Sequence, residues 1–297
     1  LGFPNPSWHE CLACPVHNVN WYEALAFCNA LSEKEGLESC YDISSCSGTI
    51  GGGCPDSGPN GGSTCSTNVP EELQYECSED PRIVENYWEC SGYRLPTVAE
   101  YEYAARGGTS TATYDGDLPS DLAGCTPYPL VDEIGWHCGN SDHPMPSGLK
   151  QENPWGLFDM LGNTSSWTET PRDGQTLGHG EQELVNPSGV EDAYSRWTKG
   201  GNFASMLCRL RCASGLGGSM HGRSAGDGFR PVRTLAELPA DAGADGGVDA
   251  GPDGGTDAGA DGGVDGGVDG GVDGGPDGGA GAEVEWVSLA GGTYMMG

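Results

Sequence analysis

The stretch from residue 153 to residue 167 constrains the fold of this chain more than any other, because it is apolar and yet repeatedly interrupted. Its large apolar side chains, which require burial, are Trp155, Leu157, Phe158, Met160 and Leu161. Gly156 and Gly162 permit positive φ angles or close approach of another backbone, and Asp159 places a carboxylate between them. The pattern is typical of a buried turn with a hydrogen-bonded aspartate, or of a loop that directs carbonyl oxygens and one carboxylate at a hard cation.

Five blocks of sequence, in order, resemble the formylglycine-generating-enzyme (sulfatase-modifying-factor) family. The stretch at 153–167 resembles the family signature NxxGLxDMxGNVWEW. The other four blocks lie at Pro15–Cys28, Tyr93–Gly108, Lys199–Asn202 and Gly228–Arg230. The resemblance covers about residues 1–234. It implies an α+β fold related to C-type lectins, compact and loop-rich, here stapled by disulfides and followed by a disordered linker.

Two capping boxes predict two helices. Asn20, with Glu23 three residues later, opens the first helix, which we expect to end at Gly36. Thr97, with Glu100 three residues later, opens the second, which we expect to end at Gly107–Gly108. Residues 196–203 are expected to form a strand that enters a glycine turn. The side chains predicted to be buried on the two helices are Trp21, Leu25, Cys28, Leu31, Tyr101, Ala104 and Ala105.

Thirteen cysteines are too many for an ordinary cytosolic enzyme and indicate an extracytoplasmic location, whether secreted, periplasmic or on the cell surface. Two short spacings predict the disulfides Cys11–Cys14 and Cys125–Cys138. Six cysteines lie in a long polar insert at residues 38–92, and the sequence does not choose among their possible pairings. A single Cys-x-x-Cys is too little for a zinc site. No stretch is long and apolar enough to span a bilayer.

The charge is strongly negative, with 13 basic and 44 acidic residues and a formal net charge of −31. This balance argues against nucleic acid or an anionic membrane as a partner. From Asp241 to Asp277 an aspartate recurs at every fourth position, mostly beside glycine. Such a composition cannot bury enough apolar area to offset the entropy of ordering, so we expect residues 237–281 to be a disordered linker.

The order of the family blocks predicts a tandem array. Residues 284–297 resemble the family's opening block, W(V/I)xIPGGxFxMG, although they stand at the end of this chain. We therefore expect residues 1–236 to be one domain without its N-terminal strand, and residues 282–297 to begin a second domain of the same family. Leu1 is not a start methionine and no signal peptide follows it, so we expect the true N-terminus to lie elsewhere.

The resemblance implies copper chemistry that this sequence does not support. In active relatives, two cysteines five residues apart bind Cu(I) and oxidise a substrate cysteine with O2, and soft thiolates suit that ion. Here Asn202 replaces the serine of the glycine motif, and Ser205 stands at the position of the first copper cysteine. Cys208 matches the second only if the segment is shortened. Cys212 matches a structural family cysteine whose usual partner position is Ala105, so we expect it to pair elsewhere. Copper is not an expected cofactor.

Calcium is the cofactor that the resemblance favours. Family calcium ligands match Asp159, Gly162 and Thr164. Ser165 replaces an active-site tryptophan of the family, and Ser166 replaces a calcium-binding glutamate, so this site is expected to be weak. The other family site would begin at Asn140 and Ser141, with Asp142 as the proposed acidic partner.

The sequence thus favours a non-catalytic binding or scaffolding module of an extracytoplasmic multidomain protein, with a protein or peptide as its partner beside a neighbouring domain of the same family. The alternative is a copper-dependent oxidase that converts a protein cysteine to formylglycine, with Cys208 as one thiolate. A third class, a calcium-dependent lectin-like binder, rests on fold analogy alone. Scattered histidines and the absence of GxSxG, P-loop and HExxH motifs argue against other chemistries.

Overall fold

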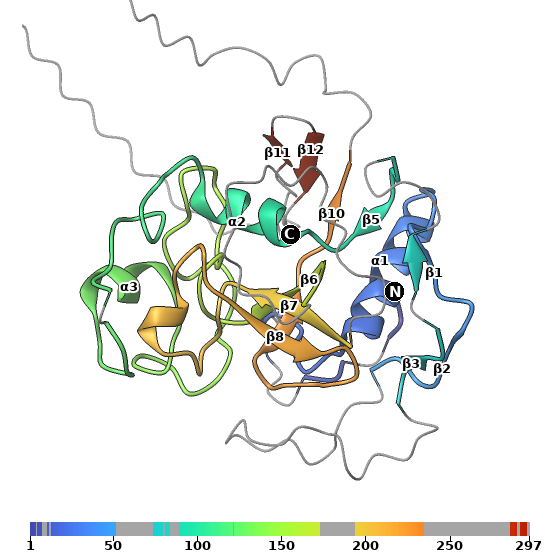
Figure 1. The fold of residues 1–297 in the computed structure, drawn as a ribbon, viewed down its shortest axis with the longest axis horizontal. Helices are drawn as coiled ribbons and strands as arrows, with labels where there is room; N and C mark the ends of the chain where they lie inside the picture. The colour runs from blue at the N-terminus through green and yellow to red at the C-terminus, as the bar shows by residue number, and fades with distance from the viewer. Residues whose placement is uncertain are drawn as a thin grey trace, which may run out of the picture.

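The structure is a computed structural model, and Figure 1 shows its ribbon. It describes residues 1–3, 5–7, 11, 13–51, 74–79, 81–83, 89–120, 122–172, 194–234, and the backbone of 286–289 and 292–295. The predicted linker at 237–281 lies outside the described residues, as do Cys54 and Cys65 of the insert. The division into two family domains therefore stays a prediction.

A four-stranded sheet forms the centre of the fold (Figure 1). Its strand order is β8-β7-β6-β9. The neighbours β8, β7 and β6 are antiparallel, whereas β9 runs parallel to β6. The strands are β6 (Ser165–Pro171), β7 (Ser195–Lys199), β8 (Gly215–Ser219) and β9 (Asp227–Phe229). Since β6 directly follows the interrupted apolar stretch, the sheet anchors the C-terminal end of that stretch.

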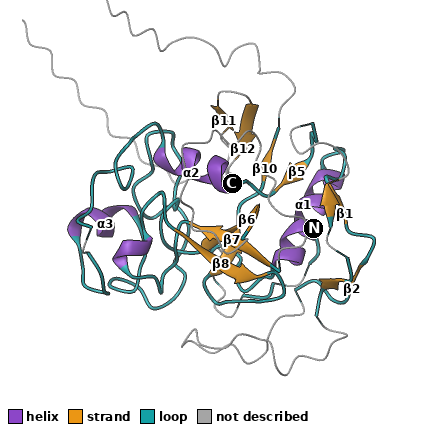
Figure 2. Cartoon of the chain, in the orientation of Figure 1, coloured by secondary structure: helices purple, strands orange, loops and turns teal. Residues whose placement is uncertain are grey.

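Short strand pairs and long loops make up much of the remainder, which Figure 2 colours teal where it is irregular. The pairs are β1 (Tyr41–Asp42) with β4 (Arg82–Ile83), β2 (Cys46–Ser47) with β3 (Glu76–Cys77), β5 (Tyr93–Arg94) with β10 (Val232–Arg233), and β11 (Trp286–Leu289) with β12 (Gly292–Met295). The fold is therefore α+β and loop-rich, as predicted.

Both capping boxes are confirmed. Helix α1 (Trp21–Lys34) has Asn20 as its N-cap, and helix α2 (Val98–Arg106) has Thr97, each with the reciprocal glutamate bond. Helix α2 ends at Gly107 in the left-handed conformation, as its glycine pair predicted. A third helix, α3 (Pro129–Ile134), and a short 3-10 helix, η2 (Leu207–Arg209), complete the helices of the described residues. Within these ranges no helix has the length and apolar character needed to cross a bilayer.

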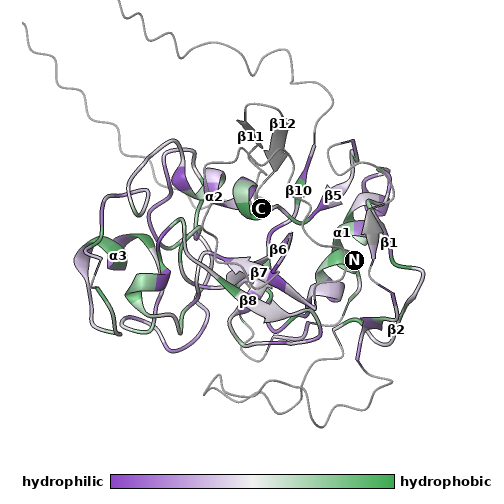
Figure 3. Ribbon diagram, viewed as in Figure 1, coloured by the Kyte–Doolittle hydropathy of each residue, from purple (hydrophilic) through white to green (hydrophobic). Residues whose placement is uncertain are grey.

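The core divides into three clusters. The largest surrounds α1 and includes Trp21, Leu25 and Trp167, while the predicted Leu31 is only partly buried. A second packs α2 against Met160 and Leu161. A third, smaller cluster joins α3 to η2. Figure 3 shows the apolar colouring along α1 and α3. Packing around these clusters holds the loops together where regular structure is sparse.

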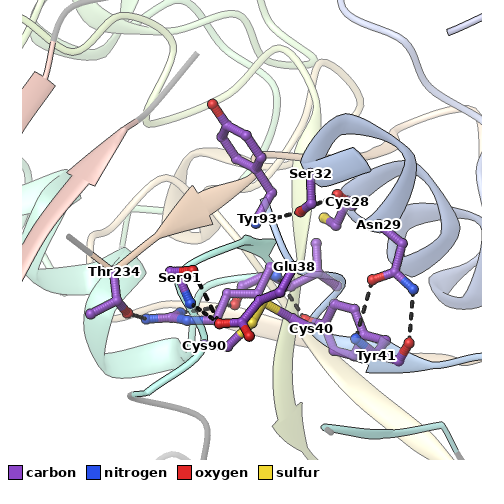
Figure 4. Close-up of a disulfide and its surroundings, with 12 residues drawn as sticks. Cys28, Asn29, Ser32, Glu38, Cys40, Tyr41, Cys90, Ser91, Tyr93 and Thr234 are labelled. Carbon is purple, nitrogen blue, oxygen red and sulfur yellow. Dashed lines mark hydrogen bonds between the residues drawn. A yellow bond between two sulfur atoms is a disulfide. The ribbon is translucent and has the colours of Figure 1, made fainter. Parts of the chain in front are cut away.

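Four disulfides join cysteines of the described residues: Cys11–Cys14, Cys40–Cys90, Cys46–Cys77 and Cys125–Cys138. Both predicted pairs are among them. Figure 4 shows how the Cys40–Cys90 disulfide lies against α1. There the Ser32 hydroxyl donates to the Cys28 carbonyl at 2.9 Å and accepts from the Tyr93 N–H at 2.7 Å. The disulfide thus joins the two ends of the insert, and hydrogen bonds of Ser32 attach the residue just after the insert to the first helix.

Candidate functional site

The interrupted stretch is fastened to α2 at its start. The Asn153 side chain is buried, and its Nδ2 donates to the Ala104 carbonyl at 2.6 Å. Its Oδ1 accepts from the backbone N–H groups of Trp155 and Leu157 at 3.0 and 3.1 Å. In an Asx-type turn of this kind, the side-chain oxygen accepts the backbone hydrogen bonds that a carbonyl would otherwise accept. One asparagine therefore both closes the turn and satisfies the carbonyl end of a helix.

The prediction that Phe158 is buried is wrong. Its side chain is 39% exposed, and Trp155 is only partly buried, while Leu157, Met160 and Leu161 are buried as expected. Positive φ angles of 77° at Gly156 and 53° at Asp159 turn the chain on both sides of Phe158. These two turns of the backbone direct the Phe158 side chain outward. The Phe158 carbonyl accepts a hydrogen bond from Arg230 Nη2 at 2.7 Å.

Two glycines allow the stretch to meet the turn after β7. Gly162 has φ of 86°, and a Cβ there would lie 2.3 Å from the Trp136 carbonyl oxygen. Gly200 also has φ of 86°, and a Cβ there would lie 2.5 Å from the Tyr101 hydroxyl. The Gly162 N–H donates to the Gly200 carbonyl at 2.8 Å. A side chain at Gly162 would clash with the Trp136 backbone and one at Gly200 with the Tyr101 side chain, so both close approaches require glycine.

The predicted catalytic positions Asn202 and Ser205 lie together directly after this turn. The Ser205 hydroxyl donates to Asn202 Oδ1 at 3.1 Å and accepts from the Asn202 backbone N–H at 3.0 Å. Asn202 Oδ1 also accepts from the Ala204 N–H at 3.1 Å. Ser205 is 7% exposed. The hydroxyl at the expected first copper position is therefore part of a local turn.

The thiols of Cys208 and Cys212 have different surroundings. Cys208 is a free, half-buried cysteine on η2. Cys212 is also free, which corrects the expectation that it pairs elsewhere. It is 1% exposed within the α2 cluster, and burial raises the pKa of its thiol to about 11. Its carbonyl accepts from the fully buried Lys199 ammonium at 2.8 Å, and the pKa of Lys199 is lowered by burial. Cys212 thus serves as a small core side chain.

A small hollow of about 10 Å³, with room for about one water molecule, lies beside the Asn202–Ser205 turn. Its lining residues are Ser165, Thr198, Gly201, Arg209, Gly215 and Leu216. Ser165, which stands where the resemblance implies a tryptophan, is one of its lining residues. Arg209 and Leu216 are exposed at this site.

Asp227 is a site residue that the sequence analysis did not identify. The Ser165 hydroxyl donates to Asp227 Oδ1 at 2.7 Å, between strands β6 and β9. Burial raises the pKa of the Asp227 carboxyl to about 6, and the Ser165 hydrogen bond offsets part of that rise. The two residues are 62 positions apart. No local spacing could have indicated this contact, because the parallel strand pairing creates it.

The predicted calcium ligands Asp159 and Thr164 have the following surroundings. Asp159 is 5% exposed, its Oδ2 accepts from the Gly148 N–H at 2.8 Å, and its Oδ1 has no hydrogen-bond partner. Thr164 instead lies beside Gly228 of β9.

The Asn140 side chain is engaged elsewhere: it donates to Asp132 Oδ1 and the Gly135 carbonyl and accepts from the His137 N–H. Ser141 Oγ donates to the His143 carbonyl. No group of three or more acidic, histidine or cysteine side chains among the described residues is placed to hold a metal.

Comparison with known proteins decides the family. Residues 5–235 match the family described as "Sulfatase-modifying factor enzyme 1-like domain". The chain belongs to this family. A solved structure, Treponema denticola variable protein 1, is similar to this sulfatase-modifying-factor chain with a TM-score of 0.54 and 26% identity, over 76% of each chain. The predicted fold is thereby confirmed.

Curated relatives carry different names. A "Chaperone protein LppX" from Paenibacillus barcinonensis is 31% identical over 64% of this chain and 66% of its own length. A "Formylglycine-generating enzyme" from Mycobacterium tuberculosis is 44% identical over 28% of this chain and 29% of its own length. This sulfatase-modifying-factor chain therefore spans at most about two-thirds of these relatives. Membership of the family does not by itself assign the activity of either protein.

Proposed function

We propose that this domain is a non-catalytic binding module for a protein or peptide. The observation that carries the proposal is the closed hydrogen-bonded pair of Ser205 and Asn202 at the expected copper position. A hydroxyl is a poor ligand for soft Cu(I), which prefers thiolates. Cys208 is then the one thiol on η2, while the Cys212 thiol is buried in a separate cluster. These different surroundings support the proposal that the two thiols do not share a copper ion.

Binding is supported by the hollow at Ser165. At this small hollow the exposed Arg209 offers a cation and the exposed Leu216 an apolar surface. Arginine beside an apolar contact is enriched at the anchoring points of protein interfaces. The name of the Paenibacillus relative, a chaperone protein, agrees with a role in binding protein chains.

Copper binding and turnover test the absence of catalysis. In competition with a chromophoric Cu(I) chelator, the full chain and its Cys208→Ala variant should withdraw the same background amount of copper. A sulfatase-type cysteine peptide incubated with the full chain should yield no aldehyde above a no-protein control. A stoichiometric copper site lost in Cys208→Ala, or aldehyde formation, would establish the copper oxidase instead.

A displayed random peptide library tests the binding surface. Peptides selected on the full chain should lose binding to a variant carrying Arg209→Glu and Leu216→Asp, and retain it on Asp142→Asn, a substitution elsewhere on the surface. Equal binding to both variants would place the binding surface away from the hollow.

Calcium would bind at Asp159 rather than at Asn140. The buried Asp159 Oδ1 without a hydrogen-bond partner is a ligand suited to a hard cation, because an orphaned buried carboxylate oxygen is costly. Gly162 and Thr164 remain the proposed companions from the same stretch. With a single carboxylate the site would be weak, and its contribution would be to fasten the 159–164 loop.

The proposed location is extracytoplasmic. Four disulfides among the described residues support an oxidising compartment, where such bonds persist. A neighbouring domain of the same family remains part of the proposal, on the resemblance of residues 284–297 to an opening block.

A further inference from the structure

A free thiol and a disulfide belong to backbone segments that contact each other beside η2. Cys208 is free and half-buried, whereas the paired Cys125 and Cys138 are exposed and half-buried, respectively. We refer to these three residues as the cysteine cluster. It is built from segments that are far apart in sequence, so its assembly is a property of the fold.

Two backbone hydrogen bonds hold the cluster together. The Cys138 N–H donates to the Ser205 carbonyl at 3.2 Å, and the Leu207 N–H donates to the Gly124 carbonyl at 3.2 Å. Leu207 directly precedes Cys208, and Gly124 directly precedes Cys125. Cys208 and Cys125 are therefore each adjacent in sequence to a residue of one backbone hydrogen bond, and Cys138 itself takes part in the other. The two bonds bring the three cysteine-bearing backbone segments together, and such proximity is a precondition for a disulfide between them.

The other two free thiols of the described residues, Cys28 and Cys212, are not accessible at the surface. Cys28 and Cys212 are both buried, and burial raises the pKa of each thiol. Buried thiols of raised pKa are inert, since the thiolate is the attacking species. Cys28 lies near the Cys40–Cys90 disulfide (Figure 4), but it is enclosed in the core with it. The cysteine cluster alone combines an accessible thiol with an accessible disulfide among the described residues.

We propose that the cysteine cluster is a thiol–disulfide exchange site. The Cys208 thiolate attacks the sulfur of Cys125, a Cys125–Cys208 bond forms, and the Cys125–Cys138 bond breaks. Cys138 leaves as a thiolate and takes a proton from water, so no external oxidant or reductant is consumed. Exposed disulfides are the labile ones in proteins. The domain can therefore present either Cys208 or Cys138 as its free thiol to a partner thiol or disulfide.

Slow trapping with a maleimide tests the exchange in the full chain. Protein purified without reductant is treated with limiting N-ethylmaleimide at mildly alkaline pH, quenched with acid, and mapped by peptide mass spectrometry. Label should appear on Cys208 in one population and on Cys138 in another, the latter with a Cys125–Cys208 peptide. The Cys138 label should be lost in Cys208→Ser and unchanged in Cys28→Ser. Label confined to Cys208, with Cys125–Cys138 intact throughout, would overturn the proposal.

A second variant tests whether the sulfurs of Cys125 and Cys208 can reach each other, independently of the rate of exchange. In Cys138→Ser, Cys125 and Cys208 are both left with thiols, and mild oxidation with a diazene dicarboxamide should join them in a disulfide. Circular dichroism confirms that the variant is folded before oxidation. If both thiols remain open to alkylation after oxidation, the two sulfurs are out of reach and the exchange cannot occur.

Discussion

Arg223 and Glu23 form a two-point ion pair inside the protein, although 200 positions separate them. Arg223 Nε and Nη2 donate to the two carboxylate oxygens at 2.9 and 2.8 Å, and both side chains are 2% exposed. Glu23 also accepts from the backbone N–H groups of Asn20 and Gly51. A single carboxylate thus joins the cap of α1, the start of the insert and the loop before β9.

Replacing Arg223 by alanine should destabilise the domain by about 3–5 kcal/mol, because a buried carboxylate would lose its countercharge. Arg223→Lys should also be destabilising, since lysine cannot make the bidentate contact. The free energy of unfolding from urea titration measures the effect. Asp142→Asn, which alters an exposed contact with His143, should cost less than about 1 kcal/mol. Equal losses in the alanine variant and this control would contradict the buried-pair interpretation.

Asp227→Asn should change how stability depends on pH. Burial raises the pKa of Asp227 from 3.8 to about 6 in the folded state. Between these values the folded state binds more protons than the unfolded state, so stability falls as pH rises through the window and stays reduced above it. Asparagine cannot ionise and removes this penalty. The free energy of unfolding of the variant, relative to the natural sequence, should therefore increase from about pH 4 to about pH 7. A pH-independent difference would show that Asp227 does not titrate in this way.

Calcium should raise the melting temperature of the full chain, and Asp159→Asn should abolish the rise. A free calcium concentration tenfold to a hundredfold above the Kd of the site corresponds to about 1–3 kcal/mol of stabilisation of the folded state. Calorimetry with and without millimolar calcium measures it, and magnesium at the same ionic strength is the control. Asp142→Asn should leave the shift intact, because the proposed site is at Asp159. A shift that survives in Asp159→Asn and disappears in Asp142→Asn would favour the other predicted site.

The three free thiols should differ sharply in reactivity. Cys28 and Cys212 are buried and carry raised pKa values, so both should resist alkylation until the chain is denatured. Of these three thiols, the half-buried Cys208 should be the one that reacts under native conditions. Mass spectrometry after native and denatured alkylation separates the two classes. Rapid native labelling of Cys212 would indicate that the α2 cluster opens readily.

Short-range features followed from the sequence alone. Both capping boxes, the end of α2 at Gly107, and the Cys11–Cys14 and Cys125–Cys138 disulfides join residues close along the chain. For such contacts local backbone geometry is nearly sufficient. The ordered family blocks likewise predicted the fold that the comparisons confirm.

Only the tertiary structure decided the contacts between distant segments. It exposed Phe158, left Cys212 as a free core thiol, joined Ser165 to Asp227, and brought the segment of Cys208 against the segments of Cys125 and Cys138. Composition and spacing do not specify which loops pack together, because the hydrophobic effect is non-directional and favours burial of apolar area in any contact. The sequence by itself determined the two capped helices and the family. The packing of α2, the interrupted stretch and the central sheet determined which side chains meet at the site.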